Sequence, residues 1–223
     1  MGYLGIISVL MILIVGCTNV EYKRHNLATN QGPQSTEANF GRQVDYYIDR
    51  EYFVSPPSCV LLLPVRDTNI SLSHRKLVEN ALTRHLSVRV NRVIDPTYLL
   101  KKLQGRGLDP RKLRDIRTFA LEEGCSAYLE INNAEISRAY AVVWTKVSAH
   151  VQLMLKNIKT DQMLWWGKHT AQRGDGGLPL TLIGAGLGSF SAGRLASDND
   201  ALPSVFEDSV RRLMSTLPDI RHP

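Results

Sequence analysis

The apolar positions of this chain follow different periods in different stretches, and each period predicts a type of element. After Pro56 and Pro57, a continuous apolar run at Cys59–Val65 is typical of a strand that is buried on both faces. A helical pattern follows this run, and either Ser71 or Ser73 is placed to cap the helix. The apolar positions of this helix recur at helical spacing and are Leu77, Val78, Ala81, Leu82 and Leu86.

The same alternation of strand and helix continues to residue 131. Val88–Ile94 predicts a short strand and Thr97–Gln104 a short helix. Asp109 and Pro110 then mark the start of another helix, as cap and first-turn residue. The predicted inner stripe of that helix is Leu113, Ile116, Ala120 and Leu121. Ala127–Ile131 predicts a third strand, and strands that alternate with helices imply a parallel sheet with right-handed crossovers.

The pattern changes to a period of two within Ala141–Asn157, which predicts a long strand. One face of this strand carries Val143, Thr145, Val147, Ala149, Val151, Leu153 and Leu155. A polar turn and the strand Met163–Gln172 complete an antiparallel hairpin, and Pro203–Leu217 predicts a closing helix. The predicted fold is therefore α/β (α+β), with a three-layer βαβαβ parallel core that is extended by a long antiparallel hairpin and a C-terminal helix.

The amino-terminal residues predict export. Tyr3–Val15 is an apolar run of about 13 residues, which suits a signal-peptide core and is too short to span a bilayer. It leads into Ile14-Val15-Gly16-Cys17, which resembles the lipobox that lipoprotein signal peptidase reads. The resemblance implies lipid on Cys17, and Thr18 after it favours the outer membrane by similarity to enteric sorting. An uncleaved anchor and a secretory signal cut elsewhere are the alternatives, and the run is not preceded by Lys or Arg.

These patterns divide the chain into four parts. Residues 1–16 are predicted to be a lipoprotein signal peptide, 17–55 a lipidated flexible tether and strap, 56–217 the globular domain, and 218–223 a tail. Thr18–Phe40 is polar and lacks apolar periodicity, which is typical of a tether. Asp45–Phe53 is rich in aromatic residues and predicts either a strap packed on the domain edge or a segment that binds a partner.

Three motifs behind the lipobox resemble a group of periplasmic lipoproteins with a TolB-amino-terminal-like, or CsgG-like, domain. They are the first strand Val60–Val65, the helix end Glu122–Tyr128 and the turn Asn157–Trp165. The group includes the curli-secretion lipoprotein CsgG, the exopolysaccharide lipoprotein PelC, the penicillin-binding-protein activator LpoB and a neisserial surface lipoprotein family. Asn157 and Asp161 stand where that group usually has Asp and Gly. The resemblance covers residues 56–217 and implies assembly into rings, dimers or activator complexes, without a shared catalytic centre.

Two groups of residues are candidate contact surfaces. The apolar, glycine-rich stretch Leu178–Leu195 is similar in character to a segment of the neisserial family. Its candidate contacts with a second subunit or with lipid are Leu182, Ile183, Gly184, Gly186, Leu187 and Gly188. A buried loop or helix within the domain is the alternative for this stretch. Trp144 and Trp166 are expected on the outer face of the hairpin, either as a partner surface or as packing.

Cys59 and Cys125 remain once Cys17 carries lipid. An even pair of cysteines in an oxidising compartment is able to form a disulfide. The predicted strands that begin near these residues are parallel neighbours, so both thiols are expected at the same edge of the sheet. Two separate buried thiols are the alternative.

Charge and motifs give no sign of catalysis. The formal net charge is +6 with basic and acidic residues interspersed, which is typical of an ordinary basic surface, and export argues against nucleic acid as a partner. No nucleophile elbow, phosphate-binding loop or zinc-protease motif is present. A metal site between His150 and His169 is conceivable, although an exposed cross-strand pair is the commoner arrangement. No catalytic residue, metal or cofactor is therefore predicted.

The sequence thus predicts a non-enzymatic lipoprotein on the periplasmic face of the outer membrane. We expect it to act as an assembly or accessory component of a secretion, polysaccharide-export or cell-wall machine, as a homo-oligomer or with an envelope protein partner. The alternative is a ligand-binding or cell-wall-acting periplasmic lipoprotein.

Overall fold

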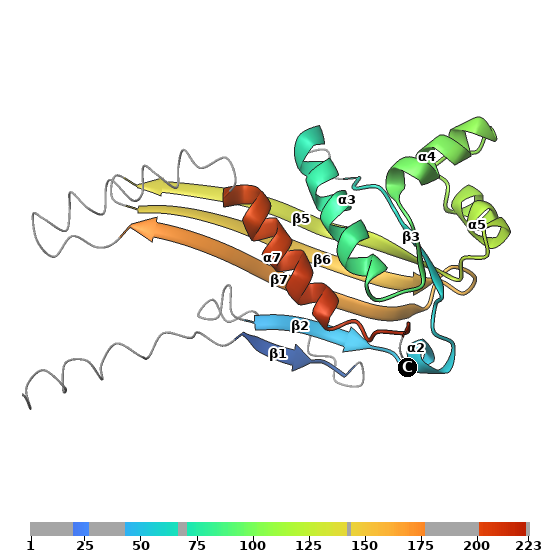
Figure 1. The fold of residues 1–223 in the computed structure, drawn as a ribbon, viewed down its shortest axis with the longest axis horizontal. Helices are drawn as coiled ribbons and strands as arrows, with labels where there is room; N and C mark the ends of the chain where they lie inside the picture. Colours follow the sequence, from blue (N-terminus) through green and yellow to red (C-terminus); the bar gives the residue numbers. More distant parts are fainter. Residues whose placement is uncertain (1–19, 27–42, 67–70, 142–143, 177–200, 222–223) are drawn as a thin grey trace, which may run out of the picture.

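Seven strands form one mixed sheet in the computed structural model, which describes residues 20–26, 43–66, 71–141, 144–176 and 201–221. The strand order is β1-β2-β7-β6-β5-β3-β4 (Figure 1). The strands are β1 (Glu21–Arg24), β2 (Gln43–Ile48), β3 (Cys59–Leu62), β4 (Arg92–Ile94), β5 (Ala127–Ala141), β6 (Trp144–Asn157) and β7 (Met163–Gly176). The helices are α2 (Glu51–Val54), α3 (Leu72–Ser87), α4 (Pro96–Gly105), α5 (Leu113–Glu122) and α7 (Ala201–Ser215). The predicted α+β fold with its C-terminal helix is confirmed.

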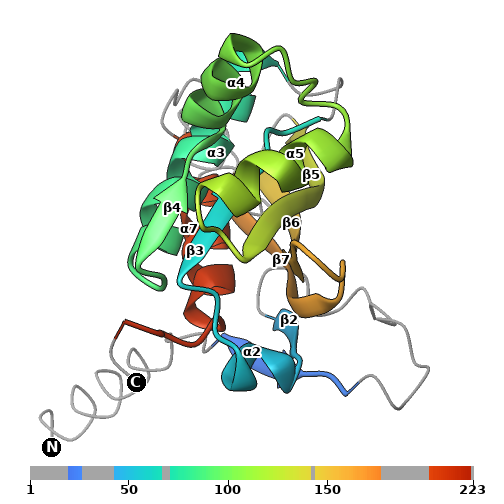
Figure 2. The ribbon, with the colours of Figure 1, turned by 90° about the vertical axis from the view of Figure 1, so that its right-hand side faces the viewer.

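The parallel core follows from two crossovers that run in opposite directions. β3 pairs in parallel with β4 on one side and with β5 on the other. Right-handed crossovers that move in opposite directions across a sheet place their helices on opposite faces. Accordingly, α3 packs with one apolar cluster, and α4 and α5 pack with a second cluster at the β3–β4 end of the sheet (Figure 2).

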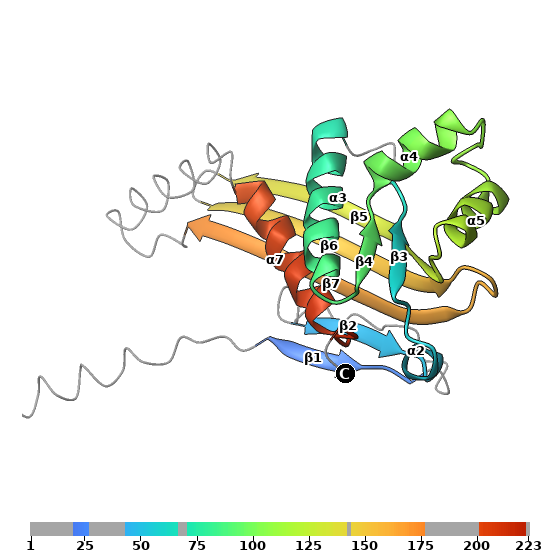
Figure 3. The same cartoon turned by 45° about the vertical axis from the view of Figure 1, so that its right-hand side comes forward.

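The larger apolar cluster lies between the sheet and the helices α3 and α7, which lie side by side across one face (Figure 3). The alternation in β6 is the predicted one, because Val147, Ala149, Val151, Leu153 and Leu155 are all buried on this face. The inward positions that were predicted for the closing helix are buried as well, and these are Val205, Phe206, Val210, Leu213 and Met214. The core of the domain is thus the face of the long strands that α7 covers.

Side-chain caps mark the starts of α3 and α4 but not the start of α5. Ser71 caps α3 by accepting a hydrogen bond from the backbone N–H of His74 at 3.3 Å, as predicted. The prediction that a helix starts at Asp109 and Pro110 is wrong, because α5 begins at Leu113. Asp109 instead closes a turn, in which its carboxylate accepts from Arg111 and its carbonyl from Lys112.

The inner stripe of α5 also differs from the prediction. Leu121 is half-exposed on the surface, whereas Phe119, which was not expected in the stripe, is fully buried. The predicted members Ile116 and Ala120 are buried, and Leu113 packs partly against the same cluster. The buried positions 116, 119 and 120 follow the i, i+3, i+4 spacing of one helix face, and position 121 lies off that face.

Several strand bounds differ from the prediction: β3 ends at Leu62 rather than Val65, and β7 continues to Gly176 instead of ending at Gln172. The second strand is only Arg92–Ile94, because residues 88–91 form the turn that follows α3. The third strand does not end at Ile131 but continues to Ala141 and pairs with the whole of β6. A β-bulge between Ile131 and Asn133 inserts one residue and reverses which positions face the core. The predicted hairpin is therefore the second half of a three-stranded meander, β5-β6-β7.

The segment that was expected to be a tether and strap contributes two strands to the sheet. β2 pairs antiparallel with β7, and β1 pairs parallel with β2 at the edge. Every residue of β1 is exposed, so the strand has no apolar alternation that the sequence could reveal. The strap is packed: Tyr52 is fully buried, and its hydroxyl donates to the carbonyl of Pro218 at 2.8 Å.

Candidate functional site

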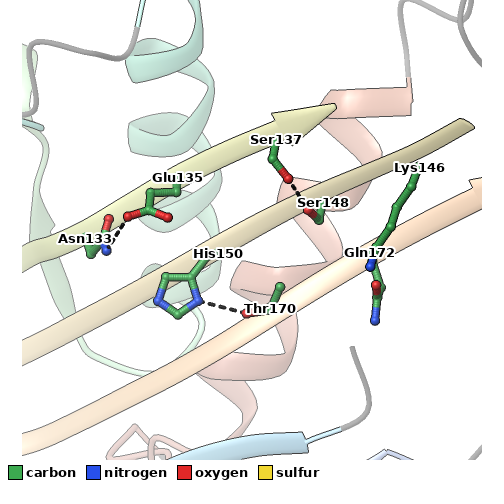
Figure 4. Close-up of a pocket in the computed structure, with 8 residues that line it drawn as sticks. All are labelled: Asn133, Glu135, Ser137, Lys146, Ser148, His150, Thr170 and Gln172. Carbon is green, nitrogen blue, oxygen red and sulfur yellow. Dashed lines mark hydrogen bonds between the residues drawn. The ribbon is translucent and has the colours of Figure 1, made fainter. Parts of the chain in front are cut away.

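The face of the meander opposite α7 carries polar side chains and forms the candidate site. We call it the polar face. Its centre is a shallow hollow of about 370 Å³, and all the residues that line it come from β5, β6 and β7 (Figure 4). They are Asn133, Glu135, Ser137, Lys146, Ser148, His150, Thr170 and Gln172. They share one face because side chains alternate along each strand and the bulge in β5 brings residues 133, 135 and 137 to this side.

The side chains of the polar face bond to one another across the strands. Ser137 and Ser148 share a hydrogen bond of 2.6 Å, and Nδ1 of His150 lies 2.8 Å from the hydroxyl of Thr170 (Figure 4). Burial lowers the pKa of His150 below its ordinary value, so the ring is neutral at physiological pH. One carboxylate, Glu135, and one ammonium, Lys146, leave the hollow with little net charge. The arrangement suits hydrogen bonding to a polar partner.

A second hollow of about 300 Å³ lies at the carboxyl end of β3, beside the bulge. Lys156 and Glu130 form an ion pair of 2.7 Å in its wall. The hydroxyl of Tyr128 donates to the carboxylate of Asp161, which also lies 3.4 Å from the guanidinium of Arg117. Burial, and then the neighbouring Asp161, raise the pKa of Tyr128 above its ordinary value, so the phenol stays protonated and acts as the donor.

The turn between β6 and β7 explains both departures from the motif of the lipoprotein group. Asn157 replaces the usual Asp and accepts hydrogen bonds from the backbone N–H groups of Lys159 and Thr160, at 2.9 and 3.2 Å. Asp161 replaces the usual Gly at a φ of 63°, a left-handed conformation that is uncommon for residues with a side chain. Its contacts with Tyr128 and Arg117 offset the conformational cost of the positive φ. The substitution therefore also links the turn to α5.

A third polar cluster joins the edge strand to the sheet. His25, just after β1, lies with its Nε2 2.8 Å from the carboxylate of Asp45 in β2. Gln43 donates to the same carboxylate at 2.7 Å. The His25 ring also stacks on Trp166 of β7, with 5.6 Å between the ring centroids. Trp166 thus packs against the amino-terminal segment, which is one of the two roles considered for it.

The predicted cysteine pair comes together in the structure as a disulfide between Cys59 and Cys125. Cys59 begins β3 and Cys125 precedes β5, with 4.5 Å between the two Cα atoms. Both residues are buried within the cluster that α4 and α5 form with the sheet. The bridge fixes the entry of β5 beside β3.

His150 and His169 do not face each other. His150 pairs in register with Thr170, and His169 with Val151, so the two rings lie on opposite faces of the sheet. His169 is 1 % exposed under α7, and its Nδ1 donates to the carbonyl of Gln43 at 2.8 Å. Within the described ranges no group of three metal-ligating side chains occurs.

We expect the buried His169 to make the domain less stable in acid. Burial lowers the pKa of His169 in the folded chain, whereas in the unfolded chain it titrates at about 6.5. The unfolded state therefore binds more protons, and stability is lost as pH falls through about 6.5. Urea unfolding between pH 7.5 and 5.5 should show a shallower pH dependence in His169→Gln, whose amide is able to donate to the same carbonyl. An unchanged slope would contradict this role of His169.

Several predicted positions lie outside the described residues. These are the lipidation site Cys17 and the candidate contacts Leu182, Ile183, Gly184, Gly186, Leu187 and Gly188. Trp144 begins β6, where its backbone pairs with Ala141 and Gly176. Among the helices that the structure describes, none has the length and apolar content needed to cross a membrane.

Sequence reasoning missed the contacts that join distant segments. His25 and Asp45 are 20 residues apart in a stretch without periodicity, and Tyr128 and Asp161 are 33 apart. The one available signal was Asp161 itself, which occupies a turn position where the resembled group has Gly.

Comparison with known proteins gives structural neighbours only. No protein-family model and no curated protein matches the sequence. Structural neighbours of this chain include bacterial lipoproteins. PelC from Paraburkholderia phytofirmans, solved as a dodecamer, is 11% identical with a TM-score of 0.38, over 72% of this chain and 89% of that chain. Lipoprotein GNA1162 from Neisseria meningitidis is 14% identical with a TM-score of 0.39, over 64% and 100%. The LpoB C-terminal domain from Salmonella enterica is 18% identical with a TM-score of 0.33, over 52% and 83%.

Proposed function

We propose that this chain is a bacterial envelope protein that is anchored by lipid on Cys17 and acts without catalysis. The main support for this proposal is the apolar run Tyr3–Val15, which leads into a lipobox-like sequence that ends in a cysteine. Two or three acyl chains on one residue anchor a protein firmly, since each buried CH₂ contributes about 0.8 kcal/mol. The proposed location is the periplasmic face of the outer membrane, by similarity to sorting rules that read Thr18.

The disulfide supports export. Disulfides persist in oxidising compartments such as the bacterial periplasm and are rare in the cytosol, where thiols are kept reduced. Cys59 and Cys125 are both buried and joined in this fold. A chain that relies on such a bridge is suited to a compartment outside the cytoplasmic membrane.

The polar face supports a role in binding rather than catalysis. Its hydroxyl, amide and charged groups are shared among three neighbouring strands and bond mainly to one another. We propose that the protein is an assembly or accessory component of a secretion, polysaccharide-export or cell-wall machine, as a homo-oligomer or with an envelope partner. Light scattering of the acylated protein in detergent, with cross-linking in the native envelope, tests this part. A strict monomer without a cross-linked partner would contradict it.

The anchor is tested by replacing its thiol. Cys17→Ser should abolish incorporation of labelled palmitate and move the protein from the membrane fraction to the soluble periplasmic fraction, because no other acylated residue is proposed. Thr18→Asp is the matched control: it should still incorporate palmitate but fractionate with the inner membrane in an enteric host. If Cys17→Ser stays in the membrane fraction as the parent does, the proposed function fails.

A further inference from the structure

The strands β5, β6 and β7 extend well beyond the edge strands at one end of the sheet. We call this end the tip, and it consists of residues 138–141, 144–147 and 173–176 (Figure 1). The opposite end of the sheet carries α2 and the β6–β7 turn. We propose that the tip contacts the lipid bilayer in which the Cys17 anchor is inserted, an inference that rests on the proposed acylation of Cys17.

The direction of β1 follows from its pairing in the sheet. β7 runs toward the tip and ends there at Gly176. β2 is antiparallel to β7, and β1 is parallel to β2, so β1 runs away from the tip. Val20, which precedes Glu21, therefore lies on the tip side of β1 and packs partly against the core. In the sequence only three residue steps separate it from Cys17.

The distance from Glu21 to the tip is close to the reach of the chain between Cys17 and Glu21. Glu21 pairs with Gln43, and the next residue of β2, Val44, pairs with His169, which puts Glu21 in the row of Thr170. β7 continues for six more residues to Gly176, so the tip lies about 20 Å beyond Glu21. The four steps from Cys17 to Glu21 span at most about 14 Å. The tip therefore reaches about 6 Å farther than Cys17 does. Both contact the bilayer if the tip enters the headgroup layer by about 6 Å, which is a usual depth for interfacial segments.

The opposite end of the sheet lies farther from the row of Glu21. β7 begins at Met163, about seven residues or about 23 Å from the row of Glu21 on that side. With that end on the membrane, Cys17 would stay at least about 9 Å above the surface, given its reach of about 14 Å. Contact through the β6–β7 turn would therefore require about 9 Å of insertion, compared with about 6 Å at the tip. It would also require the chain to reverse direction before Glu21, because Val20 lies on the tip side of β1.

The residue types of the tip suit an interface with lipid headgroups. Arg138 and Arg173 pair with Val147 from either side, and Lys146 lies in the next row. Beyond them, Tyr140 pairs with Thr145, and Trp144 ends the sheet. Trp and Tyr are enriched at membrane interfaces, and Lys and Arg beside them favour anionic headgroups. Asp175 is the one acidic residue of the tip, so basic residues outnumber acidic ones there.

Two lysines at opposite ends of the sheet provide a matched test. Lys146 lies in the tip, whereas Lys159 is exposed in the β6–β7 turn, more than about 35 Å away along β6. Lys146→Cys and Lys159→Cys are each labelled with the same fluorophore in the full-length acylated protein, where the other three cysteines are blocked by lipid or by the disulfide. The proteins are then inserted into phosphatidylcholine–phosphatidylglycerol vesicles that contain lipid with a nitroxide quencher on its headgroup.

The fluorophore at position 146 should lose most of its emission when quencher lipid is present, and the one at position 159 should keep its emission. If Lys146→Cys alters the far-UV circular dichroism spectrum, Arg173→Cys, an exposed position in the same part of the tip, replaces it. Equal quenching at both ends, or stronger quenching at 159, in protein that floats with the vesicles would overturn the tip contact and leave the anchor standing. Protein that carries no lipid and does not float would instead overturn the proposed function, and the tip contact with it.

Discussion

Trp165→Ala should lower the free energy of unfolding by about 3–5 kcal/mol, as expected for the loss of a large buried aromatic side chain. Trp165 is fully buried between β7 and α7, and its indole N–H donates to the hydroxyl of Thr216 at 3.2 Å. Gly167 leaves room for the ring, since a Cβ at that position would lie 2.7 Å from Cζ2 of Trp165. Truncation would therefore open a cavity under α7 and leave the Thr216 hydroxyl without this donor. Urea unfolding followed by circular dichroism measures the change.

Trp166→Ala is the matched control, because it removes the same side chain from the next position of the strand. Trp166 faces away from α7 and is only partly buried, with the ring of His25 stacked on it. Its loss should cost about 1 kcal/mol, the scale of one aromatic contact. If the two variants were equally destabilised, the packing of α7 on the Trp165 face would be wrong.

The parallel core was predictable because its signals are local. The run that contains β3 is apolar throughout, as a strand covered on both faces requires. Ser71, one of the two serines placed to cap the next helix, is the N-cap of α3. The alternation in β6 is just as plain, since α7 covers one face of the strand and the other face is polar. In each case the pattern of apolar residues follows the pattern of burial, so the element can be predicted from the sequence.

The missed elements are those for which burial leaves no simple pattern. β1 is exposed along its whole length and is held by backbone pairing to β2, by the His25–Asp45 contact and by the stacking of His25 on Trp166. β5 was cut short at Ile131 because the bulge shifts the alternation by one residue, so the two halves of the strand do not share a period. The candidate site depends on that bulge, which explains why the polar face was only half anticipated. The alternation predicted in β6 leaves Lys146, Ser148 and His150 on the face opposite its apolar positions, but the contribution of Glu135 and Ser137 was not predicted.

The proximity of Cys59 and Cys125, although not the bond itself, was predicted for a topological reason. In a parallel sheet, strands that are neighbours begin at the same edge, so cysteines at the starts of β3 and β5 lie close together. Period and composition alone do not give this result. It requires the order of the strands, which came from the inferred fold.

Loss of this disulfide should lower the free energy of unfolding by about 4 kcal/mol on the chain-entropy account, because the bond closes a loop between residues 66 apart. Reduction leaves two buried thiols in place, so it tests the cross-link without opening a cavity. The midpoint of urea unfolding should fall when dithiothreitol is added, and mass spectrometry should show a gain of two protons.

The double variant Cys59→Ala/Cys125→Ala separates the cross-link from the reductant. It should unfold at low urea with or without dithiothreitol, and slightly earlier than the reduced parent, because both positions are nearly inaccessible to solvent and the shorter side chains leave small voids. If reduction left the midpoint of the parent unchanged while its mass rose by two protons, the bond would form without contributing to stability. In that case packing of α4 and α5 against Leu61 and Tyr128, rather than the bridge, would hold the β3–β5 junction together.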